Sequence, residues 1–231
     1  MEVVNITTSL DIKKVFTYML DDKDVVIKFI IGSIISIIPF VNIILYGYLL
    51  DVIKNSMNNI DTLPDFKYIE QFIKGIMVAI AYIIMIFIPY FIGIIVVMAL
   101  SWILGLGNNN PLAAIVLIVG YLFIFLLIVI LNILFIIGLC QYVETDKIGS
   151  IFNIGKSIEI LKNTLIEQLK FYIVYIIVMI ILSIVVYILS IICVFTIILI
   201  PLAILLYGAL IFYSFIVIGY FIGKIYMMAK G

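Results

Sequence analysis

The chain has 231 residues, of which 67% are hydrophobic and 11% charged, and its 13 lysines balance 13 acidic residues without any arginine or histidine. Ordinary soluble domains are about 45–50% apolar and about 25% charged, so this composition excludes a water-soluble globular fold and predicts a chain that lies in lipid. A protein that binds nucleic acid needs a basic face, and the balanced charge excludes that class of partner. The two cysteines, Cys140 and Cys193, both lie in apolar runs and are expected to be small buried side chains.

Residues 8–21 have the pattern of a short amphipathic helix. Thr8 and Asp11 stand three apart, the spacing of a capping box in which two side chains satisfy backbone N–H groups at a helix start. Four apolar residues then fall on one helix face: Ile12, Val15, Phe16 and Met19. We expect this helix to lie on the membrane surface, with docking to a partner protein as the alternative.

The first membrane segment is predicted over residues 25–50. This run is apolar except for Lys28, and it is longer than the roughly 20 residues that cross the hydrocarbon of a bilayer. Pro39 lies near its middle, where a proline removes a backbone N–H and clashes with the preceding turn. Two arrangements stay open: a single crossing kinked at Pro39, which we favour, and a re-entrant segment whose two ends face the same side. Asn42 is a polar side chain within this segment, and it either bonds the neighbouring structure or contacts a bound solute.

A polar stretch, residues 51–74, separates this segment from the first predicted helical hairpin. The turn Leu63-Pro64-Asp65-Phe66 is typical of a helix start, because a proline in the first turn loses no hydrogen bond. Two apolar runs follow, residues 75–104 and 111–142, and each is long enough to cross a bilayer. The short uncharged loop between them predicts a hairpin. Asn132 is the strongly polar side chain within the second run.

A second hairpin is predicted from residues 171–199 and 201–228, with a proline at the turn. Before it, residues 151–169 repeat apolar side chains every three or four positions, which predicts an amphipathic helix along the membrane interface. The apolar stripe of this helix consists of Ile154, Ile158, Leu161, Leu165 and Leu169. Gly219 and Gly223 form a GxxxG pair, which lets two helices approach closely. We expect this pair to pack within the chain, with a dimer contact as the alternative.

Together these patterns predict an all-α fold: a polytopic transmembrane helical bundle with five main apolar segments, the first kinked or re-entrant at Pro39, plus two amphipathic interfacial helices. We expect residues 1–231 to form a single integral membrane domain. Short loops rich in lysine stay on the cytoplasmic side of a membrane, and the lysines gather in residues 51–74 and 144–170 and after the last apolar run. We therefore predict that these loops and the C-terminus face the cytoplasm.

Enzymatic chemistry is not expected. Without histidine, the usual Ser-His and Cys-His dyads and the HExxH zinc site are absent, and no charged residue lies between Gly75 and Val143 or between Phe171 and Gly223. We therefore predict no catalytic residues, no metal site and no cofactor. Two functions remain. One is a non-enzymatic scaffold that binds lipid, a protein partner or a second copy of itself. The other is a carrier or channel for a small uncharged solute, which Asn42 and Asn132 would contact.

The motif Tyr46-Gly47-Tyr48, followed by Leu63-Pro64-Asp65-Phe66 and Lys74-Gly75, is similar to that of one known family. From about residue 20 to 228 the chain resembles the archaeal membrane proteins grouped as domain of unknown function 4013. This resemblance implies an archaeal protein of the cytoplasmic membrane, but it implies no activity and no functional residues. The family often has an arginine after its Gly-Tyr pair, whereas this chain has Asp51 and Lys54.

Overall fold

The computed structural model describes residues 10–105, 110–195 and 199–230, and all regular structure in these ranges is helical. The elements in chain order are α1 (Ile12–Thr17), the 3-10 turn η1 (Tyr18–Asp21), α2 (Val25–Ile37), α3 (Ile43–Met57), α4 (Tyr68–Tyr82), the π-helical turn η2 (Ile83–Phe87), α5 (Ile88–Ile103), α6 (Pro111–Thr145), the 3-10 turn η4 (Ile148–Phe152), α7 (Ile154–Val194) and α8 (Ile200–Met228). Four continuous helices in the described ranges are long and apolar enough to cross a membrane: Tyr68–Ile103, Pro111–Thr145, Ile154–Val194 and Ile200–Met228. The predicted all-helical fold is confirmed, with four segments of membrane length rather than five.

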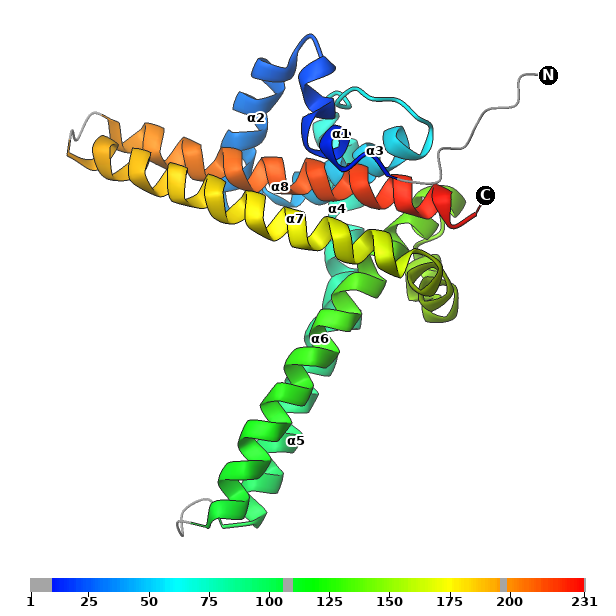
Figure 1. Ribbon diagram of the computed structural model, residues 1–231, viewed down its shortest axis with the longest axis vertical. Coiled ribbons are helices and arrows are strands. Elements are labelled where there is room, and N and C mark those ends of the chain that lie inside the picture. Colours follow the sequence, from blue (N-terminus) through cyan, green and yellow to red (C-terminus); the bar gives the residue numbers. More distant parts are fainter. Residues whose placement is uncertain (1–9, 106–109, 196–198, 231) are drawn as a thin grey trace.

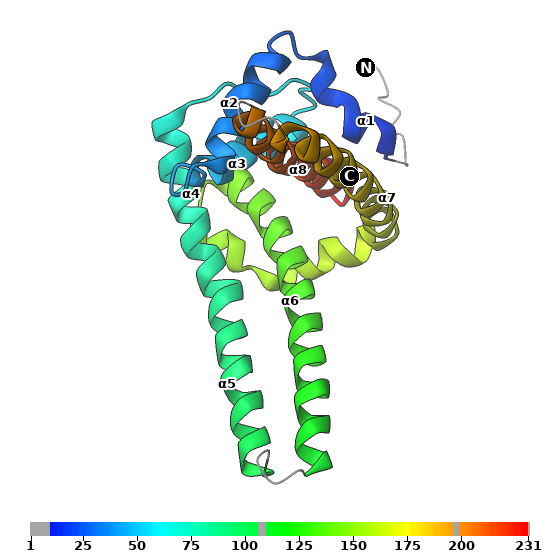
Figure 2. The same ribbon diagram turned by 90° about the vertical axis from the view of Figure 1, so that its left-hand side faces the viewer.

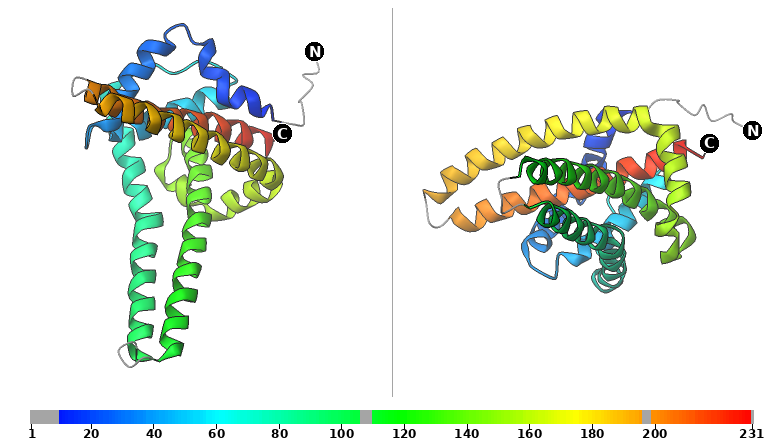
Figure 3. Two further views of the ribbon diagram at one scale, coloured as in Figure 1. Left: turned by 60° about the vertical axis from the view of Figure 1, so that its left-hand side comes forward. Right: turned by 90° about the horizontal axis from the view of Figure 1, so that it is seen from below.

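Two long helical hairpins meet at their bases (Figure 1). We call this meeting region the joint, and from it the two hairpins point in different directions. The first hairpin consists of α4, η2 and α5 running out and α6 running back, and the second consists of α7 running out and α8 running back. The second hairpin lies across the end of the first, and α1, α2 and α3 pack around the joint (Figures 2 and 3). The tips of both hairpins therefore lie away from the joint.

The first apolar segment is broken at Pro39 into two helices, α2 and α3, and is not one kinked helix. Ile38 has an extended backbone, with ψ of 115°, as expected for a residue that precedes a proline. Phe40 then has a positive φ of 66°, which non-glycine residues rarely adopt outside turns. The proline thus ends α2, and the next two residues turn the chain.

The chain reverses its direction at this break, as its contacts with α8 demonstrate. Along α2 the contacts move backwards on α8, from Phe212 beside Phe29 to Gly208 beside Ser33. Along α3 they move forwards on α8, so that Gly219 and then Gly223 pack against successive turns of α3. The start of α2 and the end of α3 consequently lie on the same side of the joint, which is the geometry of the re-entrant alternative.

The N-terminal helix is shorter than residues 8–21. It begins after Asp11, whose side chain accepts a hydrogen bond from the backbone N–H of Lys14 at 3.2 Å. The predicted capping residue Thr8 lies outside the described residues. Val15 and Met19 are buried against the joint, so one face of this segment packs on protein.

The predicted interfacial helix 151–169 is not a separate element. From Ile154 onward it is continuous with the membrane-length helix α7. The predicted apolar stripe is not the face that packs on protein, because Ile154, Ile158, Leu165 and Leu169 are exposed. The buried face instead carries smaller and polar side chains: Ser157, Ile160, Thr164 and Gln168. The reason is a polar contact with α6, in which Gln141 Nε2 donates to Ser157 Oγ at 2.8 Å.

The first hairpin begins earlier than residue 75, because its outgoing helix starts at Tyr68 and continues to Ile103. Pro89 lies within this helix, two residues after the end of the π-helical turn η2. A proline in a regular α-helix clashes with the carbonyl four residues earlier, and such clashes are relieved where a wider turn inserts one more residue. Here the backbone N–H of Ile88 bonds the carbonyl of Ile83, five residues back.

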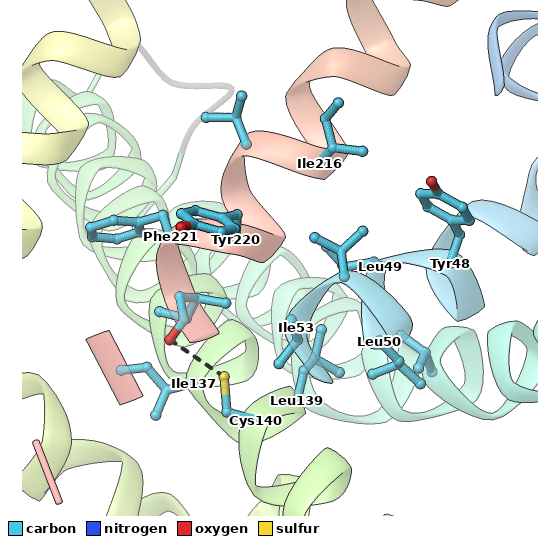
Figure 4. Close-up of a cluster of buried hydrophobic side chains, with 14 of the residues drawn as sticks. Tyr48, Leu49, Leu50, Ile53, Ile137, Leu139, Cys140, Ile216, Tyr220 and Phe221 are labelled. Carbon is cyan, nitrogen blue, oxygen red and sulfur yellow. Dashed lines mark hydrogen bonds between the residues drawn. The ribbon is translucent and has the colours of Figure 1, made fainter. Parts of the chain in front are cut away.

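A buried hydrophobic cluster draws on most of the helices, and part of it lies where α3, α6 and α8 meet (Figure 4). Ile53 of α3, Ile137 of α6 and Ile216 of α8 are each fully buried there. Cys140 belongs to this cluster, and its Sγ donates a hydrogen bond to the carbonyl of Ile222 at 3.6 Å. Contacts between segments far apart in sequence thus hold the joint together.

Candidate functional site

The loop between α3 and α4, residues 58–67, lies beside the joint and is bonded to side chains of five helices, α1, α2, α3, α4 and α8. Leu63 is 2% exposed. Its backbone N–H donates to Asp22 Oδ2 at 2.9 Å, and its carbonyl accepts a hydrogen bond from Lys28 Nζ at 2.8 Å. The neighbouring carbonyl of Pro64 accepts a hydrogen bond from the Tyr48 hydroxyl at 3.0 Å. The predicted turn is therefore held by side chains from before α2, from α2 and from α3.

The last two residues of the turn motif complete this attachment. Asp65 forms an ion pair with Lys28 at 3.0 Å. Phe66 stacks on Tyr48 with ring centroids 4.6 Å apart, and it also lies against Phe212 of α8 at 6.0 Å. Each residue of the Leu-Pro-Asp-Phe motif thus contacts another part of the joint.

Two glycines of the motif allow α3 and α4 to cross at backbone contact. A Cβ on Gly47 would lie 1.9 Å from the carbonyl oxygen of Gln71, and a Cβ on Gly75 would lie 2.1 Å from that of Ile43. Real Cβ atoms do not approach an oxygen this closely. Glycine is therefore required at both positions, because any side chain would push the two helices apart.

Gln71 is fully buried at the same crossing, and each of its polar atoms is bonded. Its Nε2 donates to Asp51 Oδ2 at 2.8 Å and to the carbonyl of Asp65 at 3.0 Å, and its Oε1 accepts from the backbone N–H of Lys67. Sequence reasoning did not identify Gln71. Its position could have indicated this role, because a polar side chain in the first turn of a helix can cap a free backbone N–H. Gln71 caps the N–H of Lys67, four residues earlier.

Asp61, in the same loop, gathers groups from α1 and α8. Its Oδ1 accepts a hydrogen bond from the Tyr220 hydroxyl at 2.6 Å, and its other oxygen bonds Lys14 Nζ. Lys224 lies 3.8 Å away and also bonds the side chain of Asn59. Partial burial acts to raise the pKa of Asp61, but the hydrogen bonds from Lys14 and Tyr220 and the charge of Lys224 outweigh it and lower the pKa.

This lowered pKa predicts a pH dependence of stability. A carboxylate whose pKa falls on folding stabilises the protein above the ordinary pKa of aspartate, and the contribution disappears as the pH falls through the lowered value. We expect Asp61→Asn to cost about 1 kcal/mol near neutral pH, as for a partly exposed ion pair. Unfolding titrations from pH 6 to pH 3 should show this difference between variant and wild type shrinking. A difference that stays constant over this range would contradict the assignment.

A second carboxylate, Glu144, joins the ends of α6, α7 and α8 in the same manner. Its Oε2 accepts a hydrogen bond from the Tyr226 hydroxyl at 2.5 Å and lies 3.5 Å from Lys156 Nζ, and its Oε1 bonds Lys230. Helix α8 and the residues directly after it thus carry two Tyr-x-x-x-Lys units, one bonded to Asp61 of the 58–67 loop and the other to Glu144 at the end of α6. Each lysine also lies 5.2 Å from the ring of its own tyrosine. The repeated spacing was visible in the sequence, but the acidic partners were not.

The two asparagines predicted as intramembrane polar positions do not form a common site. Asn42 is exposed at the break between α2 and α3, and its side chain does not cap α3. Asn132 donates from Nδ2 to the carbonyl of Ile128 at 2.9 Å, one turn earlier in its own helix. The backbone of α6 therefore already satisfies the amide of Asn132.

The GxxxG pair of α8 lies against α3 of the same chain. A Cβ on Gly219 would meet Leu49 at 2.8 Å, and a Cβ on Gly223 would meet Ser56 at 2.7 Å. Between them the Ser56 hydroxyl donates to the carbonyl of Tyr220 at 2.5 Å. This glycine face is thus occupied by a neighbouring helix within the chain.

The polar groups of the joint bond one another and the neighbouring backbone. In the part of the chain that the structure describes, no three His, Cys, Asp or Glu side chains are grouped so that they could hold a metal ion. The buried carboxylate of Asp22 bonds a lysine and a backbone N–H, and Cys140 is enclosed in the apolar core. These groups hold loops and helix ends together.

The family model described as a protein of unknown function (DUF4013) matches residues 31–195. This range contains the two glycines of the α3–α4 crossing and the whole turn motif. No curated protein and no solved structure matches the chain.

Proposed function

The chain belongs to the DUF4013 family, and we propose that it is a multi-pass protein of the cytoplasmic membrane of an archaeal cell that serves as a non-enzymatic scaffold for a partner protein or lipid. One observation carries this proposal: polar groups gather at the joint and bond one another, while the apolar sides of the hairpins stay uncovered. On α6, for example, Leu122, Phe123 and Phe125 are each more than half exposed. A surface of this kind is stable only against hydrocarbon or another protein.

The extent of the uncovered surface supports the same conclusion. The accessible surface is 13,793 Å² for a chain of 26.2 kDa, whereas a compact soluble monomer of this mass exposes about 10,600 Å². The excess comes from the extended hairpins, whose helices of 29 to 41 residues are longer than the roughly 20 needed to cross a bilayer. The hairpins thus have enough length to cross with a tilt and still reach the joint.

We place the joint on the cytoplasmic side. The lysines near the joint and the absence of charge toward the hairpin tips support this orientation. The reversal at Pro39 supports a re-entrant first segment, with both of its ends beside the 58–67 loop. Because the second hairpin lies across the end of the first (Figures 1 and 2), a flat bilayer that receives the first hairpin along its normal leaves the second close to the membrane plane.

A partner protein is expected to use the exposed apolar stripe of α7. Replacing Leu165 and Leu169 together with glutamine should remove a stoichiometric partner from the protein purified in native-lipid nanodiscs and analysed by mass spectrometry. The matched control replaces the exposed polar residues Lys162 and Asn163 with glutamine and should retain the partner. Recovery of the bare wild-type protein with one enriched small molecule would contradict the protein-scaffold proposal.

The alternative, a carrier or channel for a small uncharged solute, makes a different prediction. Because Asn132 Nδ2 donates to the backbone of its own helix, we expect Asn132→Leu to change the free energy of unfolding by less than about 1 kcal/mol and to leave partner recovery unchanged. A carrier that uses this amide would instead move solute across liposomes, and Asn132→Leu would abolish that flux. Flux by wild type that the variant lacks would favour the carrier.

A further inference from the structure

An apolar cleft of about 480 Å³ lies between α7 and α8 near the tip of the second hairpin. Its walls are formed by Tyr187, Ser190, Ile191, Val194 and Phe195 of α7 and by Ile200, Ala203, Ile204 and Tyr207 of α8. Clefts of about 300–1,000 Å³ are the size that accommodates small organic ligands in proteins. The cleft is separate from the joint and serves none of the attachments described above.

Among the residues that the structure describes, three hydroxyl-bearing ones line this apolar cleft. Ser190 is 7% exposed, and its Oγ has no hydrogen-bond partner among the residues that the structure describes. Other serines of the hairpins do bond their own helix, as Ser101 does with the carbonyl of Val97 at 2.8 Å. The Ser190 hydroxyl is thus buried in the wall of the cleft without a hydrogen bond to any described residue, and other staggered positions about its Cα–Cβ bond are open to a serine.

Tyr187 and Tyr207 supply the other two hydroxyls, one from each helix, and both side chains are exposed. A hydroxyl that faces hydrocarbon without an acceptor is unfavourable, so three donors at one cleft favour a ligand that carries acceptor oxygens. Within the described ranges, no lysine, aspartate or glutamate lines the cleft, so these residues offer no counter-charge for a phosphate or carboxylate headgroup. The two tyrosine rings also offer flat faces against which a planar ring can pack.

We propose that this cleft binds a neutral, membrane-soluble molecule of the quinone type: a planar ring that carries carbonyl oxygens and an apolar tail. The hydroxyls of Tyr187 and Tyr207, and that of Ser190 after rotation, donate to the carbonyl oxygens, and the aliphatic side chains of both helices contact the ring edge and the tail. This inference rests on the membrane location proposed above. It concerns binding alone and requires no redox step.

The test uses the full chain in nanodiscs and tritiated 2-decyl-1,4-benzoquinone as the probe. Filtration binding is compared with empty nanodiscs, so that simple partition into lipid is subtracted. We expect saturable excess binding of one probe per chain. Tyr187→Phe and Tyr207→Phe each retain the ring and should weaken binding by about fivefold, as expected for the loss of one hydrogen bond. Ser190→Ala should weaken it to a similar extent.

Two matched controls should bind as wild type does: Ser183→Ala, an exposed serine of α7, and Tyr90→Phe, an exposed tyrosine of α5. Ala203→Phe fills the cleft and should abolish the excess binding, and each variant's helix content is checked by circular dichroism. Binding no greater than in empty nanodiscs would overturn the proposal. So would excess binding that the three hydroxyl variants leave unchanged, because this would mean an occupant held by its hydrocarbon alone. Failure of the chain to insert into nanodiscs would instead refute the membrane location.

Discussion

Replacing Gly47 with alanine is expected to destabilise the protein by about 3 kcal/mol, the upper part of the range for overpacking a closely packed contact. The added Cβ would lie 1.9 Å from the carbonyl oxygen of Gln71. This oxygen belongs to the backbone, so no side-chain rotation relieves the clash, and α3 and α4 must separate. The free energy of unfolding in mild detergent, from a denaturant titration followed by circular dichroism, measures the effect.

The control for this substitution is Gly155→Ala. Gly155 lies in the first turn of α7, where a Cβ would meet nothing closer than the Asn153 side chain at 3.8 Å. Alanine favours a helix over glycine by roughly 0.5–1 kcal/mol, so this variant should be equal to or more stable than wild type. If Gly47→Ala were as stable as Gly155→Ala, the close crossing of α3 and α4 would be wrong.

Asp22→Ala is the second substitution with a large expected effect, about 3 kcal/mol, as for removing one partner of a buried ion pair. Asp22 is 6% exposed. Its carboxylate accepts hydrogen bonds from Lys28 at 3.1 Å and from the backbone N–H groups of Leu63 and Asp24. The substitution removes one of the two carboxylates that pair with the mostly buried Lys28. It also removes the acceptor of the buried backbone N–H of Leu63. A denaturant titration measures the loss.

The neighbouring residue provides the matched control. Asp21 has the same charge and chemistry but is exposed, so Asp21→Ala should change the stability by less than about 0.5 kcal/mol. Thermolysin cleavage gives a second readout, because release of Leu63 should expose the 58–67 loop to the protease in Asp22→Ala alone. Equal stability and equal cleavage of the two variants would rule out Asp22 as the attachment point of the loop.

The membrane-length helices were predictable because their signal is local. An uncharged run longer than the bilayer is sufficient evidence for a crossing helix, and the runs around the loop at 105–110 and around Pro201 appear as hairpins. Pro39 was equally informative about where the first segment breaks. The sequence of the first segment does not decide between a kinked helix and a reversal of the chain, because that choice depends on how α2 and α3 pack against α8.

The polar joint was largely hidden in the sequence. Asp22, Gln71 and Glu144 are ordinary polar residues of charged stretches, and only the fold brings their partners to them from 41, 20 and 86 positions away. The apolar stripe of residues 154–169 did not reveal which face of the helix packs on protein, for a related reason. The periodicity of apolar residues identifies an apolar face of a helix. In a chain surrounded by lipid, however, the face that packs on protein can be the one that carries small and polar side chains.

The glycines illustrate both situations. The GxxxG spacing of Gly219 and Gly223 indicated a close helix contact, and the structure supplies the neighbour, α3. Gly47 and Gly75 have no such spacing, because they lie on different helices. Their need for glycine follows only from the crossing that the structure describes.

Site-directed labelling of single cysteines tests the central claim, a joint on one side of the membrane with a re-entrant first segment. In a background with Cys140→Ala and Cys193→Ala, cysteines are introduced one at a time in place of Lys23, Asn58 and Trp102. A membrane-impermeant maleimide is then applied to right-side-out and inside-out vesicles. The account predicts that the cysteines at 23 and 58 are labelled from the cytoplasmic side and the cysteine at 102 from the opposite side. Labelling of positions 23 and 58 from opposite sides would contradict it.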